Sequence, residues 1–101
     1  MKLIFGNPGS GKTKALLELS AKNNIPVLCE SQARVERLLV KAKGYGYDIP
    51  LPITMNSLSE DVKEVYIDDI KRVLDAVLHT SLAGITVNSD EDLEIVDLDK
   101  R

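Results

Sequence analysis

The amino-acid sequence predicts an α/β domain in which helices flank a small, mainly parallel β-sheet. The alternation of apolar segments along the chain and the chain length support this fold class. Short apolar runs alternate with longer stretches in which apolar residues recur at helical spacing. Strands separated by such helices pair in parallel, and right-handed crossovers place the helices on both faces of the sheet. The chain has 101 residues, the usual size of one domain, so residues 1–101 are expected to form a single domain.

The expected elements follow from these patterns. Helices are expected where apolar residues recur every three or four positions, over residues 12–23, 31–44 and 69–81. Strands are expected over the short apolar runs, with a turn or short helix after the third of them. The strands cover residues 2–5, 25–29, 53–55, 64–68 and 85–88, and the turn covers 56–61.

The acidic segment 89–101 is expected to form either a strand or a solvated tail. It carries an apolar patch over residues 93–98. Only four residues separate this patch from the expected strand at 85–88, which is too short for a parallel crossover. A strand in this segment would therefore form an antiparallel hairpin with residues 85–88, or pair elsewhere, for example with another subunit.

The composition is that of an ordinary globular chain. The net charge is −3, which offers no basic surface to nucleic acid or anionic lipid, so no direct nucleic-acid binding is expected. No apolar run is long enough to span a membrane and no signal-peptide pattern is present, so a cytoplasmic location without membrane association is expected. The single cysteine, Cys29, excludes an intramolecular disulfide and is expected to be a small core residue.

One motif carries specific chemistry, because residues 6–13 (GNPGSGKT) match the pattern G-x-x-x-x-G-K-[ST] at every position. Such a loop curls so that successive backbone N–H groups point inward and bind phosphate oxygens. Its glycines permit the required dihedral angles, and the helix that follows adds the positive end of its dipole. The candidate nucleotide-binding residues are Gly6, Asn7, Pro8, Gly9, Ser10, Gly11, Lys12, Thr13 and the following Lys14.

With a strand before it and a helix after it, this motif resembles that of the P-loop NTPases. The resemblance implies a three-layer sandwich, in which a small, mainly parallel sheet lies between layers of helices. It also implies a nucleoside triphosphate, ATP or another NTP, and Mg²⁺ as the cofactors. In the family the motif lysine, here Lys12, contacts the β- and γ-phosphates and acts in catalysis, and the hydroxyl of Thr13 ligates magnesium.

The family's second motif is an apolar strand that ends in aspartate, and residues 64–69 (EVYIDD) supply it. Asp68 would hold magnesium through water, opposite Thr13, or it would only cap the next helix. Asp69 stands where water-activating branches of the family have glutamate. It is therefore the candidate for orienting the attacking water, or it only favours the start of the helix.

Several segments resemble a reduced RecA- or helicase-type core, in which an extra strand lies between the loop strand and the aspartate strand. On this mapping Asn88 is the candidate sensor of the γ-phosphate, although Asn88 and Ser89 also suit a plain turn. Phages and mobile elements encode short chains that this one resembles. The matching segments cover residues 4–19, 25–39, 53–58, 65–70 and 85–90.

The resemblance implies an ATP–magnesium-binding NTPase with slow intrinsic hydrolysis. No arginine finger is obvious, because Arg34 and Arg37 fall on the second expected helix and Arg72 on the third, and a missing finger costs orders of magnitude in rate. Full activity is therefore expected to need a protein partner or a homo-oligomer. Two alternatives stay open: a nucleotide-gated binding module without significant hydrolysis, and a small nucleoside or nucleotide kinase.

Overall fold

The computed structural model describes residues 1–99, which form an α/β fold with three α-helices and small parallel sheets. The last two residues of the segment 89–101 lie outside the described part. In chain order the elements are β1 (Lys2–Phe5), α1 (Lys12–Asn23), β2 (Val27–Cys29), α2 (Gln32–Tyr45), β3 (Ile53–Thr54), the 3₁₀ turn η1 (Met55–Ser57), β4 (Tyr66–Ile67), α3 (Ile70–Leu78) and β5 (Glu94–Asp97).

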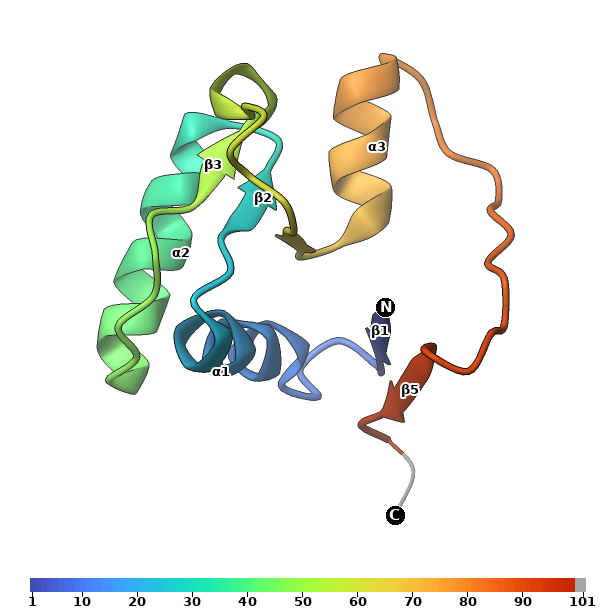
Figure 1. Cartoon of the computed structure of the whole chain (residues 1–101), viewed down its shortest axis with the longest axis horizontal. Helices are drawn as coiled ribbons and strands as arrows, with labels where there is room; N and C mark the ends of the chain where they lie inside the picture. The colour runs from blue at the N-terminus through green and yellow to red at the C-terminus, as the bar shows by residue number, and fades with distance from the viewer. Residues whose placement is uncertain (100–101) are drawn as a thin grey trace.

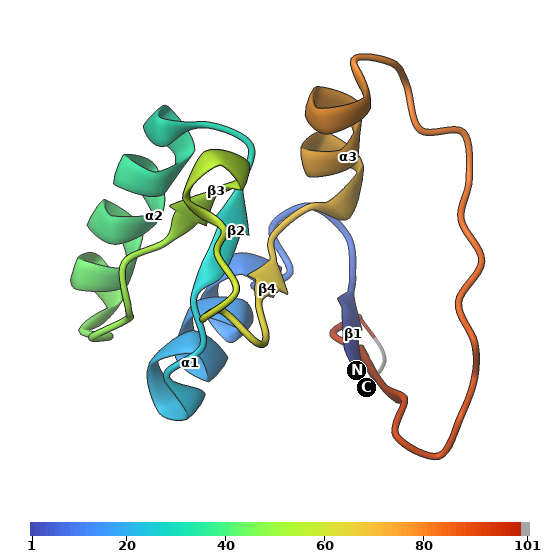
Figure 2. The ribbon, with the colours of Figure 1, turned by 45° about the horizontal axis from the view of Figure 1, so that its top comes forward.

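Within the described residues, all strand pairs are parallel, as the alternation of strands and helices predicts, but the strands form two sheets (Figures 1 and 2). One sheet has the order β3-β2-β4, with Leu28 opposite both Ile53 and Ile67. The other consists of β1 and β5. The strand that leads into the glycine loop and the strand that leads to Asp68 therefore belong to different sheets.

Residues 94–97 of the acidic segment form a strand, β5, which makes no hairpin with residues 85–88 but pairs elsewhere, the other arrangement that the sequence leaves open. β5 pairs in parallel with β1, with Leu3 opposite Ile95, and the backbone N–H of Glu94 donates to the Met1 carbonyl at 3.0 Å. Residues 85–88 have no regular secondary structure, so the strand and the hairpin expected there are wrong for this structure. Among the described residues, β5 takes β1 as its partner, and residues 85–88 pair with no strand.

The third helix is shorter than its apolar periodicity predicts. It ends at Leu78 because His79 adopts left-handed dihedral angles, with φ 56°, and its N–H bonds the Asp75 carbonyl. The strands expected at 25–29 and 64–68 are likewise shorter than their apolar runs. In the helix and in both strands, the apolar pattern extends beyond the residues that adopt regular secondary structure.

The core lies where α1 and α2 pack against β2. Cys29 belongs to it, as expected, and is 2% exposed. Val27, also on β2, and the apolar stripes of the two helices supply the remaining members. They are Leu16, Leu17, Val27, Val35, Leu38 and Ala42.

Replacement of a core leucine on α2 should destabilise the protein measurably. Leu38 is fully buried, so Leu38→Ala should lower the free energy of unfolding by about 2–5 kcal/mol, since it removes apolar contacts and leaves a cavity. Val40, on the same helix, is 72% exposed, and Val40→Ala should change the stability by less than about 0.5 kcal/mol. Urea denaturation of both variants would measure this, and equal effects would contradict this assignment of the core.

Candidate functional site

The loop between β1 and α1 requires glycine at three positions. Gly9 and Gly11 have φ angles of 83° and 93°, in the left-handed region that other residues avoid. A Cβ atom on Gly6 would lie 2.5 Å from the Ser10 hydroxyl oxygen, because the loop turns tightly there. The backbone N–H of Ser10 closes the turn on the Asn7 carbonyl at 3.0 Å. The left-handed backbone thus explains Gly9 and Gly11, and the close approach of the Ser10 side chain explains Gly6.

The loop leads directly into the N-terminus of α1. Gly11 occupies the N-cap position and supplies no side-chain acceptor for the first-turn N–H groups. Such uncapped N–H groups, together with the helix dipole, attract anions. The Ser10 hydroxyl is buried in the same loop and has no hydrogen-bond partner among the described residues. A polar ligand at the loop would satisfy both features.

Lys12 folds back over this loop. Its ammonium donates to the carbonyl oxygens of Gly6 and Asn7, both at 2.8 Å. The lysine thus sits at the loop, as the motif predicts, but it is bound to the loop's own backbone. To reach a phosphate, the ammonium has to exchange one or both carbonyls for phosphate oxygens, which are stronger, charged acceptors.

A carboxylate already contacts the loop from the C-terminal segment. The backbone N–H of Asn7 donates to Asp99 Oδ2 at 2.6 Å. The pairing of β5 with β1 brings Asp99 there, since β5 ends two residues before it. The structure therefore shows an anionic group on one N–H of the loop, which sequence reasoning did not predict. The signal in the sequence is only the acidic tail, and its location depends on a pairing between the two ends of the chain.

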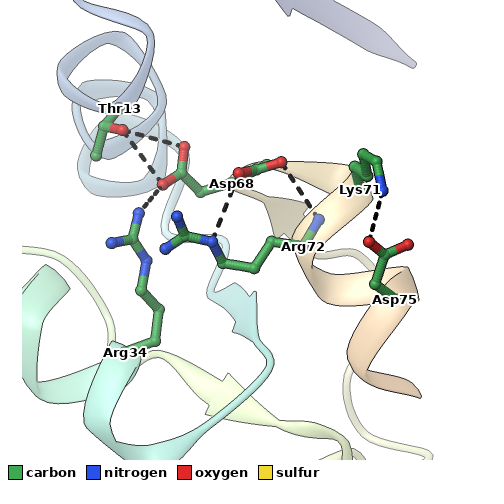
Figure 3. Close-up of polar contacts among 7 residues, drawn as sticks. Thr13, Arg34, Asp68, Lys71, Arg72 and Asp75 are labelled. Atoms are coloured by element: carbon green, nitrogen blue, oxygen red, sulfur yellow. Dashed lines mark hydrogen bonds and ion pairs between the residues drawn. The ribbon is translucent and has the colours of Figure 1, made fainter. Parts of the chain in front are cut away.

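Thr13 and Asp68 meet at the start of α1 (Figure 3). The Thr13 hydroxyl lies 3.2 Å from both carboxylate oxygens of Asp68, although the two residues are 55 positions apart. The sequence predicts these two as the magnesium-binding pair, and the structure brings them together. The alternative that Asp68 only caps α3 is wrong, because Asp69 is the N-cap residue.

Arg34 is the third member of this cluster. Its guanidinium forms an ion pair with Asp68 Oδ2 at 2.5 Å, and both side chains are about nine-tenths buried, with exposures of 10% and 11% (Figure 3). The Ser31 hydroxyl accepts from the Arg34 backbone N–H and thereby caps α2, which fixes where the arginine leaves the helix. Arg34 Nε is buried and has no partner among the described residues.

The sequence predicts that Arg34 lies on a helix but does not predict its position at the site. The signal for its location is that α2 begins just after β2, and β2 pairs in parallel with β4. The carboxyl ends of parallel neighbours lie at one edge of the sheet, so the first turn of α2 lies beside Asp68. The cluster of Thr13, Asp68 and Arg34 is called the Asp68 cluster below.

Asp69 and Asn88 lie outside the Asp68 cluster. Asp69 has a left-handed backbone, with φ 62°, and its Oδ1 accepts from the Arg72 backbone N–H at 3.3 Å. Its other oxygen lies 3.6 Å from Arg72 Nε, and the side chain is 49% exposed. Asn88 is exposed in the segment between α3 and β5, which runs away from the sheets (Figures 1 and 2).

The oxygen donors at the site suit a cation that brings other ligands with it. Among residues 1–99 there is no group of three or more His, Cys, Asp or Glu side chains that could hold a metal. Thr13 and Asp68 supply one hydroxyl and one carboxylate. Mg²⁺ keeps several waters and commonly takes one or two protein oxygens together with phosphate oxygens, so this pair fits a phosphate-bound Mg²⁺. The cation would have to share Asp68 with Arg34.

Cys29 lies close enough to the Asp68 cluster to be affected by its charges, but it stays a thiol. Burial raises the pKa of Cys29 to about 11, the negative charges of Glu30 and Asp68 add to the rise, and Arg34 opposes it. A thiol with this pKa is protonated at neutral pH and is a poor nucleophile.

No family model matches the chain, and no curated protein or solved structure is similar to it. Among the described residues, no helix has the length and apolar character that a membrane crossing requires.

Removal of Arg34 should destabilise the fold. In Arg34→Ala the nearly buried Asp68 carboxylate loses its cationic partner, so the free energy of unfolding should fall by about 3 kcal/mol. Arg37, exposed on the same helix, provides the matched control, and Arg37→Ala should change stability by less than about 0.5 kcal/mol. Urea denaturation measures both. A loss in Arg34→Ala no larger than that of the control would contradict the ion pair.

Proposed function

We propose that this chain is a P-loop protein that binds ATP, or another nucleoside triphosphate, together with Mg²⁺ and hydrolyses it slowly. One observation carries the proposal. The Thr13 hydroxyl and the Asp68 carboxylate, from distant parts of the chain, meet at the N-terminus of the helix that follows a glycine-rich loop. If the glycine-rich turn had no role in binding, nothing would require a carboxylate beside the hydroxyl in the first turn of the helix that follows it.

In this proposal the loop and the start of α1 bind the phosphates. The uncapped N–H groups of α1 and the unpartnered Ser10 hydroxyl would donate to phosphate oxygens. Lys12 would turn from the Gly6 and Asn7 carbonyls towards the β- and γ-phosphates. Thr13 and, through water, Asp68 would hold Mg²⁺, which neutralises phosphate charge when it is bound.

Hydrolysis would use in-line attack by water at the γ-phosphorus. The water oxygen bonds to phosphorus as the bond to the bridging oxygen breaks, and ADP leaves with that electron pair. Asp69 would orient the water and accept its proton, for which it has to release the Arg72 contacts that hold it. Because the Asp69 carboxylate is held by Arg72, a low intrinsic rate of hydrolysis is expected. Stimulation of that rate by a partner or by self-association is also expected.

We assign the fold to the RecA- and helicase-type branch as part of the same proposal. The strand that precedes the loop, β1, and the strand that ends at Asp68, β4, are not hydrogen-bonded to each other. This separation supports the branch in which another strand lies between them. It argues against the branch in which they are neighbours, to which the nucleotide kinases belong.

A nucleotide-gated module is the second candidate, and a specific observation favours it. Arg34 already neutralises Asp68, and Asp69 already caps α3, so the free protein has satisfied the two carboxylates that hydrolysis would use. Nucleotide binding would then rearrange these contacts and alter the surface of α2 or α3 without turnover.

Binding of ATP and GTP, with and without Mg²⁺, tests the proposal. Lys12→Ala should weaken binding of Mg²⁺–ATP by about 10- to 100-fold, since it removes charge-assisted hydrogen bonds to phosphate. Lys41→Ala, exposed on α2, should bind like the wild type. Calorimetry measures the affinities, and an unchanged affinity in Lys12→Ala, or no binding by the wild type, would refute the proposal. Phosphate release that Asp69→Asn reduces would favour hydrolysis, whereas binding without release would favour the module.

The contact between Asp99 and the loop should oppose nucleotide binding. Removal of its charge in Asp99→Asn should tighten ATP binding by about fivefold, the effect of one unit charge about 4 Å away in a water-like medium. Glu91→Gln removes an exposed charge from the same acidic segment and should leave the affinity unchanged. If Asp99→Asn binds ATP no more tightly than Glu91→Gln does, Asp99 is not a competitor for the loop.

A further inference from the structure

Arg34 lies near two carboxylates and contacts only one of them. Asp68 directly follows β4, Glu30 directly follows the parallel neighbour β2, and Arg34 lies in the first turn of α2. Burial raises the pKa of the Cys29 thiol, the negative charges of Glu30 and Asp68 raise it further, and the charge of Arg34 lowers it. All three charged groups therefore lie close to the same thiol. The ion pair of Arg34 is with Asp68.

Arg34 and Glu30 each keep a buried polar atom without a partner. Arg34 uses its Nη2 atom for the ion pair with Asp68, and its Nε–H has no acceptor among residues 1–99. The Oε2 oxygen of Glu30, which is partly buried, has no donor within the same residues. A buried donor and a buried acceptor left unpaired each cost free energy. These two would satisfy each other, since one belongs to a guanidinium and the other to a carboxylate.

The start of α2 puts Glu30 within reach of Arg34. Ser31 is the N-cap residue of this helix, so Glu30 directly precedes the cap and Arg34 is the third helical residue. A side chain at this third position can reach back to the cap, as it does in a capping box. The Ser31 hydroxyl holds the turn by accepting from the Arg34 backbone N–H at 3.2 Å. Arg34 can therefore turn from Asp68 to Glu30 by a change of rotamer, while α2 stays in place.

The burial of the ion pair decides where Arg34 has to go if Asp68 becomes a metal ligand. The side chains of Arg34 and Asp68 are only 10% and 11% exposed. A guanidinium that loses its carboxylate at such a position, and gains no other acceptor, is an unpaired buried charge and strongly destabilising. Glu30 is the acceptor that would avoid this cost.

We propose that Arg34 is a two-position switch, which pairs with Asp68 in the free protein and with Glu30 when Asp68 is given to Mg²⁺. The second position rests on the proposed function, because Mg²⁺ is part of it. Arg34 on Asp68 then keeps the carboxylate from free Mg²⁺, and it releases the carboxylate only to Mg²⁺ that arrives with a nucleotide. Glu30 is a positioning residue, which acts on the site through Arg34.

Folding stability without nucleotide tests the second position. Asp68→Asn removes the first carboxylate, so Arg34 should then pair with Glu30. In that background, Glu30→Gln should lower the ratio of folded to unfolded protein by about tenfold, because it removes a charge-assisted hydrogen bond. In the wild-type background the same change should alter the ratio by less than about twofold, since Oε2 has no partner there.

Urea denaturation of the four proteins in this cycle measures the difference. Glu36→Gln, which removes an exposed carboxylate from α2, is the matched control and should change the ratio by less than about twofold in both backgrounds. A larger loss from Glu30→Gln in Asp68→Asn than in the wild type supports the switch. Equal losses in the two backgrounds would overturn it.

Nuclear magnetic resonance of the Arg34 side chain is a second measurement, which needs no change at Asp68. Arg34→Lys identifies the Nε–H signal by its absence. Addition of Mg²⁺–ATP should slow the hydrogen exchange of this N–H by about tenfold, because it gains an acceptor, and Glu30→Gln should abolish the slowing. Unchanged exchange in a wild type that binds Mg²⁺–ATP, or the same slowing in Glu30→Gln, would overturn the proposal.

The two measurements separate this proposal from the proposed function. A wild type that does not bind Mg²⁺–ATP refutes the nucleotide function, and the stability cycle still decides whether Arg34 can pair with Glu30. If Asp68→Asn fails to fold, the exchange of the Arg34 Nε–H in the wild type decides instead.

Discussion

The contacts of one carboxylate, that of Asp68, hold the three parts of the site together. It lies at the carboxyl end of β4, nearly buried, where a charge without partners would be costly. The Thr13 hydroxyl approaches it from α1 and the Arg34 guanidinium from α2. The start of each helix is thereby fixed against the end of β4. The same carboxylate that stabilises this junction is the one that the proposed function assigns to Mg²⁺, so one group would serve both structure and binding.

The glycine loop is satisfied by the protein's own groups in a corresponding way. Lys12 donates to two loop carbonyls, and Asp99 accepts from the Asn7 N–H. A phosphate would replace the neutral carbonyl acceptors of Lys12 with anionic oxygens and would compete with the Asp99 carboxylate for the Asn7 N–H. In the free protein Lys12, the Asn7 N–H and Asp68 are thus engaged by the protein's own groups, and ligand binding would exchange partners at both places. This exchange is what would let a nucleotide alter the positions of α2 and of the C-terminal segment.

Local pattern predicts the parts of the fold that depend on neighbours in sequence. The bounds of β1 and α1 and the burial of Cys29 follow from apolar spacing. The pairing of Thr13 with Asp68 is what the resemblance of the two motifs to those of the P-loop NTPases implies. Arg34 could not be placed from the sequence, because its approach to Asp68 depends on how α2 sits against two strands. The pairing of β5 with β1 joins opposite ends of the chain, which no local signal encodes. Residues 85–88 show the reverse, since their strand pattern is clear but no edge pairs with them in the structure.

The most direct test of the account is a double-mutant cycle on Mg²⁺–ATP affinity with Thr13→Val and Asp68→Asn, each checked for folding by circular dichroism. If both residues hold one Mg²⁺ at the phosphates, each single variant should weaken binding. The affinity of the double variant should then lie within about threefold of that of the single variant that binds more weakly, because the second change removes an interaction already lost. Losses that simply add would contradict the shared site, as would variants that bind Mg²⁺–ATP as tightly as the wild type.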